Sequence, residues 1–173
     1  FCERWSVVVL ALSLLTADLA AIVPIYFGRR KPGYSHLRHT ISELGEAASP
    51  VARSVAFLGF LPTGLSVWLF LLLAAAAAPQ ASRNTFYLLS LVGAAYVGAG
   101  FFRSDQDAPL FGSWRNTAHN ILGSFEYLAA AGAFISLERD DFWGPLSTFG
   151  KYAGFLIFAC FCGIGFAHPL RGL

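Results

Sequence analysis

Two polar segments of an otherwise apolar chain hold the side chains that could do chemistry. The first segment contains Ser42 and Glu43, and the second contains Asp105 and leads into His119. In acyl transfer, a serine attacks, a histidine takes its proton, and an acid orients the histidine. Ser42, His119 and Asp105 could fill these three roles. The candidate catalytic residues are therefore Ser42, Glu43, Asp105 and His119.

The same segments also allow ligand or metal binding. Guanidinium groups hold phosphate and carboxylate through bidentate hydrogen bonds. The candidate ligand-binding residues are Arg38, His39, Arg103 and Arg115. His39, Asp105 and His119 could instead hold a zinc ion, with the fourth position left for an activated water. No HExxH, GxSxG or paired CxxC motif supports any of these chemistries, so metal and cofactor stay unassigned.

A structural explanation competes with catalysis in the first segment. Thr40 followed by Glu43 fits a capping box, which predicts a short interfacial helix over residues 41–48. Ser42 and Glu43 would then lie in its first turn and serve capping and packing. A structural hydrogen bond from His119 to this segment is an equally simple role for the histidine.

The composition indicates a membrane protein. The chain of 173 residues is 56% hydrophobic and 13% charged, whereas soluble domains carry about 25% charged residues. A helix needs about 20 apolar residues to cross the hydrocarbon layer. Apolar runs of roughly this length cover about 5–27, 51–78, 85–102, 116–137 and 148–167. We expect one all-α domain over residues 1–173, a polytopic transmembrane bundle of five spans.

Counting the spans places the two polar segments together. Successive loops of a polytopic protein alternate between the two faces of the membrane. The first loop, residues 28–49, and the third loop, residues 103–115, must therefore lie on the same face. This parity joins two distant segments into one candidate site.

Two acids lie within the apolar runs, Asp18 in the first and Glu126 in the fourth. Intramembrane acids are costly and usually turn into the bundle. Glu126 follows His119 by two helical turns, about 10.5 Å along the axis, so both project from one face. The two acids could share a proton or bind a cation. Alternatively, each could be a protonated carboxyl that holds helices together through a hydrogen bond.

Charge and cysteine content exclude several partners. The net charge is +2, and the basic residues lie at the ends of the spans rather than along one stripe, so we expect no nucleic-acid partner. Cys2, Cys160 and Cys162 form neither a metal quartet nor a disulfide framework. The expected partners are the lipid bilayer and, through aromatic and small-residue helix faces, other membrane subunits.

Four short segments of the chain carry a family pattern. They are Pro32-Gly33-Tyr34 through Arg38, Thr40-Ile41-Ser42-Glu43-Leu44-Gly45, Phe102-Arg103-Ser104-Asp105 and His119-Asn120. With the order of spans, they resemble the domain-of-unknown-function nine-nine-eight family of small bacterial and archaeal integral membrane proteins. The resemblance implies six helices, the sixth starting soon after Gly172-Leu173, and it implies no particular reaction.

The chain departs from that family pattern at two places. Arg103 replaces a proline that is usual before the acid, which adds a cation to the turn. Trp114 and Arg115 stand where many members have another histidine one turn before the equivalent of His119, which weakens the metal interpretation.

The orientation in the membrane rests on two opposing indications. More basic residues flank the face of the two polar segments, so the positive-inside rule favours the cytoplasm. Arginines kept for a ligand distort that count, and the family resemblance places these loops outside. We expect the loops on the extracytoplasmic face of the bacterial plasma membrane.

The sequence therefore predicts a multi-pass protein with a polar pocket at one membrane face. The pocket would bind or process a lipid headgroup or a small amphiphile. One alternative is an accessory subunit of a larger membrane complex. A proton- or ion-coupled carrier that uses Asp18 and Glu126 is a third hypothesis.

Overall fold

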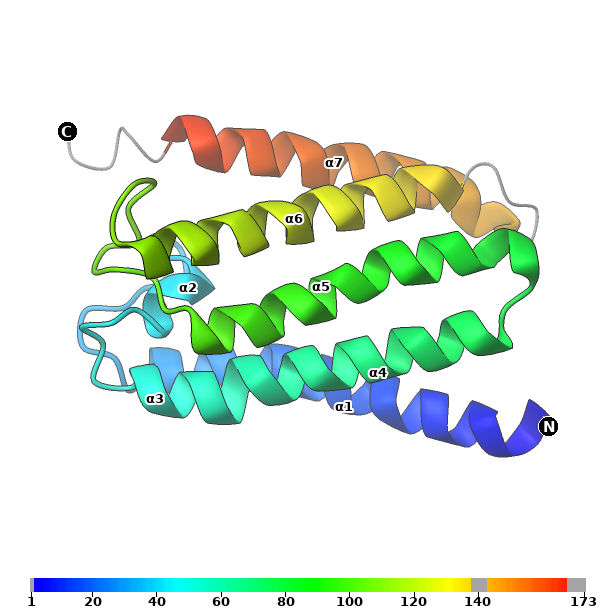
Figure 1. Ribbon diagram of the computed structural model, residues 1–173, viewed down its shortest axis with the longest axis horizontal. Helices are drawn as coiled ribbons and strands as arrows, with labels where there is room; N and C mark the ends of the chain where they lie inside the picture. Colours follow the sequence, from blue (N-terminus) through cyan, green and yellow to red (C-terminus); the bar gives the residue numbers. More distant parts are fainter. Residues whose placement is uncertain (1, 138–142, 168–173) are drawn as a thin grey trace.

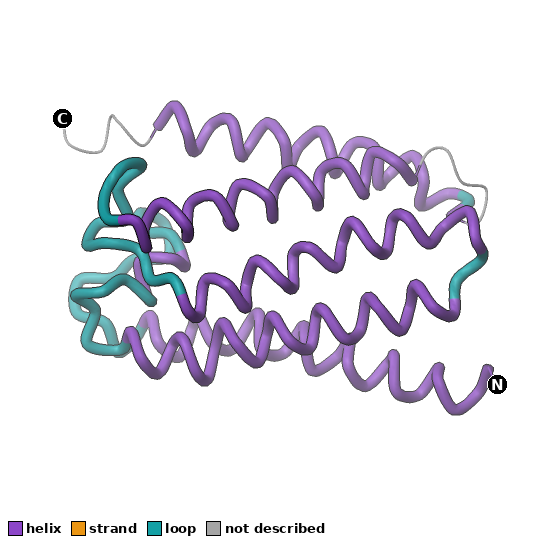
Figure 2. The backbone as a smooth tube through the Cα atoms, viewed as in Figure 1, coloured by secondary structure: helices purple, strands orange, loops and turns teal. Residues whose placement is uncertain are grey.

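Five long rods of helix lie side by side and alternate in direction (Figure 1). The computed structural model describes residues 2–137 and 143–167, and every regular element within these ranges is helical (Figure 2). The elements are α1 (Cys2–Gly28), α2 (Ile41–Leu44), α3 (Ala52–Val55), the π-helical η1 (Ala56–Phe60), α4 (Leu61–Ala77), the 3₁₀ turn η2 (Gln80–Ser82), α5 (Arg83–Phe101), α6 (Trp114–Ser136) and α7 (Pro145–Ala167). The second rod is formed by α3, η1 and α4 in succession.

The predicted all-α bundle is confirmed, since each rod lies on one of the five apolar runs. Within the residues that the structure describes, four helical segments are long and apolar enough to cross a membrane, which indicates a membrane-embedded protein. They are Val7–Gly28, Ala52–Ala77, Arg83–Phe101 and Pro145–Ile164. Helix α6 has a comparable length but carries Arg115, Asn116 and His119 in its first turns, so its span stays a prediction. The predicted sixth span would begin at residues that lie outside the described ranges.

Each long helix packs against its neighbours in the chain, in the order α1, α4, α5, α6 and α7. Helices α4 and α5 approach each other closely at two glycines, since a Cβ atom at Gly64 would come 2.6 Å from the Val97 nitrogen. A Cβ atom at Gly93 would come equally close to the Trp68 nitrogen, 2.6 Å. Small residues allow such backbone contact between membrane helices.

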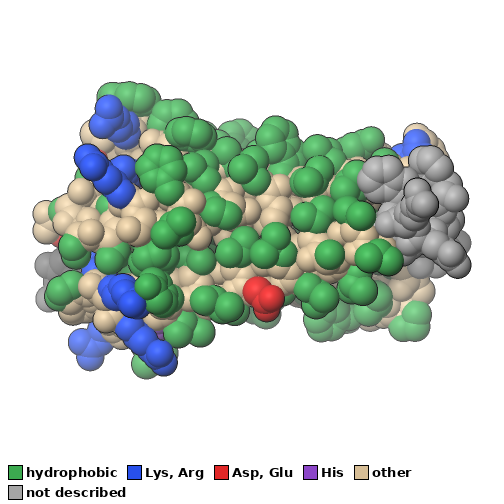
Figure 3. All heavy atoms as spheres, turned by 90° about the horizontal axis from the view of Figure 1, so that it is seen from below, with side chains coloured by type: hydrophobic (Ala, Val, Ile, Leu, Met, Phe, Trp, Pro, Cys, Tyr) green, Lys and Arg blue, Asp and Glu red, His purple; other side chains and the backbone are tan. Residues whose placement is uncertain are grey.

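The outer surface is largely apolar along the rods. Hydrophobic side chains cover the face seen in Figure 3, and Lys and Arg gather chiefly at the end that holds the first and third loops. Both loops lie at that end of the bundle (Figure 2). The Ala47 N–H donates to the Ser104 carbonyl over 2.9 Å, which joins the two loops directly. The expectation from span parity is thereby confirmed.

Helix α2 is shorter than predicted. The sequence favours a helix over residues 41–48, whereas the structure ends it at Leu44. Gly45 terminates the helix, and the backbone beyond it turns so that Ala47 bonds to the third loop instead of continuing the helix. A tertiary hydrogen bond therefore overrides the local helical pattern.

Candidate functional site

Ser42 and His119 form a hydrogen-bonded pair at the loop end of the bundle. The His119 Nε2 lies 3.0 Å from the Ser42 Oγ, and the His119 Nδ1 lies 2.7 Å from the Phe102 carbonyl oxygen. Since a carbonyl only accepts, the Nδ1 atom carries the proton and donates it. The Nε2 lone pair then accepts from the Ser42 hydroxyl. This is the arrangement of a nucleophile and its base, with a backbone carbonyl orienting the base.

Local structure explains why these two side chains meet. Leu44 is fully buried with Phe60 in the core cluster, and this anchors α2 over the end of the bundle. Gly45 permits the approach, because a Cβ atom there would lie 2.6 Å from the Phe60 ring. On the other side, α5 ends in an extended residue, Phe102. Its carbonyl is therefore directed out of the helix and is free to accept from His119.

Asp105 has a different role from the one predicted. Its two carboxylate oxygens accept hydrogen bonds from the Ser113 backbone N–H and the Ser113 hydroxyl, each over 2.7 Å. These bonds, the backbone one first, lower the pKa of the Asp105 carboxyl. The Asp105 N–H donates to the Asn116 Oδ1 over 3.0 Å. Asp105 thus closes the third loop onto the start of α6, and the orienting position beside His119 belongs to Phe102.

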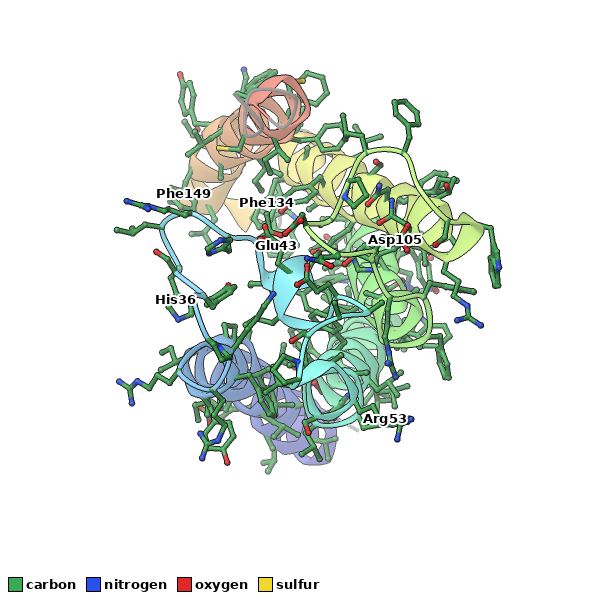
Figure 4. All side chains as sticks on the ribbon, turned by 90° about the vertical axis from the view of Figure 1, so that its left-hand side faces the viewer. His36, Glu43, Arg53, Asp105, Phe134 and Phe149 are labelled. Atoms are coloured by element: carbon green, nitrogen blue, oxygen red, sulfur yellow. The ribbon has the colours of Figure 1, made fainter. Side chains whose placement is uncertain are left out.

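Glu43 forms the predicted capping box. Its Oε1 accepts from the Thr40 N–H over 2.8 Å, and its Oε2 lies 4.0 Å from the His39 Nε2. Figure 4 places Glu43 near the middle of the loop end, whereas Arg53 points outward. Burial, and then the negative charge of Glu43, raise the pKa of the Tyr34 hydroxyl, because both disfavour its ionised form.

A cavity of about 300 Å³ adjoins the serine–histidine pair. It is lined by residues of the first loop, α5 and α6, among them His39, Ser42, Tyr96, His119, Glu126 and Tyr127. The cavity therefore runs from the membrane face along the polar side of α6. Its wall combines a candidate nucleophile with hydroxyl, imidazole and carboxyl groups, which can hold a polar ligand.

Asp18 does not share this cavity. It is exposed on α1, at the edge of the bundle, whereas Glu126 lines the cavity between α5 and α6. The structure thus separates the two acids that could have shared a proton or a cation.

Comparison with known proteins gives one family. The family model described as "Protein of unknown function (DUF998)" matches residues 14–173. The chain belongs to this family. The resemblance stated from the sequence is thereby confirmed over most of the chain. No match is found among the curated proteins or among the solved structures.

In this DUF998 member, two of the predicted anion-binding arginines lie apart from the serine–histidine pair. Arg103 and Arg115 line a separate surface hollow of about 570 Å³, together with Asp105 and Trp114. The Arg115 guanidinium carbon lies 5.5 Å from the centroid of the Trp114 ring. Arg38 is exposed on the first loop.

The alternative zinc site is not assembled. His39 lines the inner cavity, while Asp105 lines the outer hollow. Both nitrogens of His119 are engaged by Phe102 and Ser42. Among the residues that the structure describes, no three His, Cys, Asp or Glu side chains are grouped so as to hold a metal ion.

An ion pair that sequence reasoning missed lies within the first loop of this DUF998 member, and its carboxylate also bonds to the third loop. The Lys31 Nζ lies 2.7 Å from the Glu46 Oε1 and donates to the Glu43 carbonyl over 2.6 Å. The Glu46 Oε2 accepts from the Asp107 N–H over 2.8 Å. Both partners of the pair are largely buried, with side-chain exposures of 14% and 7%. Spacing in the sequence carries no signal for the Glu46–Asp107 contact, because the two loops meet only in the folded bundle.

Proposed function

We propose that the protein is a membrane-embedded enzyme that transfers or hydrolyses the acyl group of an amphiphile. Ser42 is the nucleophile and His119 is the general base. The observation that carries this proposal is the hydrogen-bonded series from the Ser42 Oγ through the His119 imidazole to the Phe102 carbonyl. It lies beside a cavity at one end of the bundle, within reach of both water and lipid.

The chemistry would proceed in two halves. The Ser42 Oγ bonds to the carbonyl carbon of an ester or amide while the His119 Nε2 takes the hydroxyl proton. The C–O or C–N bond then breaks, and the leaving alcohol or amine receives that proton from His119. In the second half, His119 takes a proton from water, the hydroxyl oxygen bonds to the acyl carbon, and the carboxylic acid leaves. Ser42 regains its proton from His119.

His39 supports the proposal by offering a donor in the same cavity. Its Nδ1 accepts from the Ser35 N–H over 2.9 Å, so in the neutral ring the Nε2 carries the proton. The Tyr96 side chain lines the same space. Donors placed where negative charge develops stabilise the tetrahedral intermediate. His39 and Tyr96 are the candidates for that role.

The proposal requires α6 to cross the membrane as the fourth of the five predicted spans. Asn116 and His119 are buried, and Gly123 and Glu126 line the cavity, so its polar residues face other protein elements. Helices α5 and α7 pack on either side of it. Polar residues of a membrane helix are expected on such interior faces.

Labelling with a compact fluorophosphonate tests the proposal, since this reagent phosphonylates activated serines. We expect an adduct on Ser42 in protein purified in mild detergent, found by peptide mass spectrometry. His119→Gln should slow labelling by about 10²- to 10⁴-fold, the usual contribution of a general base. Ser90→Ala is the matched control, because the Ser90 hydroxyl bonds only the Tyr87 carbonyl of its own helix. Equal labelling rates in the wild type and His119→Gln, or a folded wild type without an adduct on Ser42, would contradict the proposal.

A further inference from the structure

A second cavity, of about 310 Å³, lies on the α7 side of the serine–histidine pair. It shares Ser42, His119, Gly123 and Tyr127 with the inner cavity. The serine–histidine pair therefore lies between two cavities rather than at the end of one.

The two spaces differ in chemistry. The inner cavity contains His39, Tyr96 and Glu126. The second cavity has a more apolar wall, with Leu110 of the third loop and Phe161 and Ile164 of α7, although Thr40, Asn120 and Ser124 also line it. A polar group is favoured on one side of Ser42 and a hydrocarbon on the other.

The second cavity also lies at an edge of the bundle. It is enclosed by α6, α7 and the third loop, and α7 forms an edge of the bundle. The Tyr127 and Phe161 rings stack across α6 and α7 with their centroids 5.7 Å apart, and both line the space. A hydrocarbon chain could therefore enter from the bilayer between these helices.

Gly123 leaves open space where the two cavities meet, because it has no side chain. It lies one turn beyond His119 on α6, and a Cβ atom at this glycine would meet nothing within 4 Å. An alanine methyl group would project into the shared space without displacing a neighbour, and a longer side chain would occupy more of that space. Gly132 of the same helix also has nothing within 4 Å but is exposed on the outside of the bundle, which makes it a matched control position.

We infer that the substrate is a long-chain acyl ester or amide whose acyl chain occupies the α6–α7 cavity. The polar remainder of the molecule lies against His39, Tyr96 and Glu126. Gly123 is then a specificity-determining residue, because it leaves the space through which the chain leads away from the carbonyl carbon at Ser42. This inference rests on the proposed function for its reaction, although the binding of the chain can be measured without any reaction.

Photocrosslinking measures that binding directly. A long-chain acyl amide with a diazirine near the end of its chain is bound to the Ser42→Ala protein and irradiated. We expect crosslinks concentrated at Leu110 and residues 161–164. Adding Gly123→Leu should reduce them by about tenfold, since added or missing methylene groups in an apolar pocket change binding on this scale. Adding Gly132→Leu should leave them unchanged. Crosslinks spread over exposed residues such as Phe149 and Phe155, and equal in the two leucine variants, would overturn the inference.

A second measurement separates this inference from the proposed function. Ser42 of the Gly123→Ala protein is labelled with a compact and with a long-alkyl fluorophosphonate, and thermal unfolding confirms that the variant is folded. We expect the rate for the long-alkyl reagent to fall relative to the compact one. An unchanged ratio of the two labelling rates in Gly123→Ala would contradict the proposed position of the acyl chain, but not the catalytic role of Ser42. Crosslinking at residues 161–164 without any adduct on Ser42 would retain chain binding and reject the catalytic role.

Discussion

The Nε2 atom of His119 lies 3.0 Å from the Ser42 Oγ, although 77 residues separate the two side chains along the chain. The Phe102 carbonyl fixes the histidine ring from its other side. A neutral imidazole held in this tautomer can only accept at Nε2. The pair is therefore oriented for proton transfer from the hydroxyl before any substrate binds.

Replacing the serine by cysteine should convert the pair into a reactive thiol. In Ser42→Cys, His119 can take the thiol proton, and a thiolate beside a protonated histidine is a strong nucleophile. We expect the new thiol to react with iodoacetamide at least about tenfold faster than in the double variant Ser42→Cys/His119→Gln. Native Cys162, partly exposed on α7, serves as the internal reference in each sample. Equal rates with and without the histidine would show that the hydrogen bond is purely structural.

Asp105 should make the stability of the fold depend on pH. Hydrogen bonds from the Ser113 N–H and hydroxyl keep the pKa of its carboxyl below the ordinary value. A carboxyl with a lower pKa in the folded state stabilises the fold above the unfolded pKa, about 3.9. That contribution is lost as the pH falls through the folded value. We expect Asp105→Asn to unfold at a lower temperature than the wild type at about pH 7, with the difference disappearing near pH 2.

Asp107 supplies the control for this pH series. It is exposed two residues further along the same loop, with a positive φ of 61° that asparagine tolerates well. Thermal unfolding of Asp107→Asn should follow the wild type at each pH. A difference between Asp105→Asn and the wild type that persists unchanged in acid would reject the role of the charged carboxylate.

The Lys31–Glu46 pair of the first loop should hold the Glu46 carboxylate in place for its bond to the third loop. Removing one partner of a largely buried ion pair leaves the other charge uncompensated, at a cost of about 3–5 kcal/mol. We expect Glu46→Ala to destabilise the fold on this scale and to expose the Asp107 amide to hydrogen exchange, because that amide donates to Glu46. Unfolding in mild detergent measures the first effect.

A double-mutant cycle distinguishes the pair from its separate side chains. In Lys31→Met/Glu46→Leu both charges are absent. The loss of stability should therefore be smaller than the sum of the losses measured for Lys31→Met and Glu46→Leu separately. Arg53→Ala, at an exposed position on the same end of the bundle, should have little effect. Strict additivity of the Lys31 and Glu46 substitutions would show that the contact contributes nothing.

The sequence predicts the architecture because the membrane restricts it. An apolar run of about 20 residues has little choice but to form a helix. Span parity then brings Ser42 and His119 to one face without any knowledge of packing. Residue types then make Ser42 and His119 one candidate pair among several serines and histidines, such as Ser104 and His39, that parity places on that face.

The remaining features of the site depend on backbone atoms and on packing. The acceptor that orients His119 is the Phe102 carbonyl, and a carbonyl is present at every residue, so no sequence pattern distinguishes it. Asp105 is chemically suited to that position, but Ser113 lies closer to it in the loop and occupies both oxygens. Glu46 could not be assigned either, because its partners come from both loops.

Arg103 and Arg115 should bind the headgroup of an anionic lipid in their outer hollow. Hydrogen bonds to charged groups contribute about 1.5–3 kcal/mol each, so Arg103→Ala or Arg115→Ala should weaken the binding of phosphatidylglycerol by about tenfold or more. Native mass spectrometry of the protein with phosphatidylglycerol or phosphatidylcholine measures this effect. Arg53→Ala, an exposed position that does not line the hollow, should bind as the wild type does. Equal loss for all three variants would indicate a general charge effect rather than a site.

Cysteine accessibility should show that α6 crosses the membrane. In a background without native cysteines, Leu37→Cys and Phe111→Cys carry exposed thiols on the first and third loops, where the native side chains are 96% and 89% exposed. Gln80→Cys lies at the opposite end of the bundle, and Leu146→Cys follows α6. If α6 is a span, a membrane-impermeant maleimide should label Leu146→Cys from the same side as Gln80→Cys, and the other two from the opposite side. Labelling of Leu146→Cys together with Phe111→Cys would place α6 outside the bilayer and remove the basis for lipid entry beside Ser42. Labelling of the loop thiols in intact cells would place the site on the extracytoplasmic face.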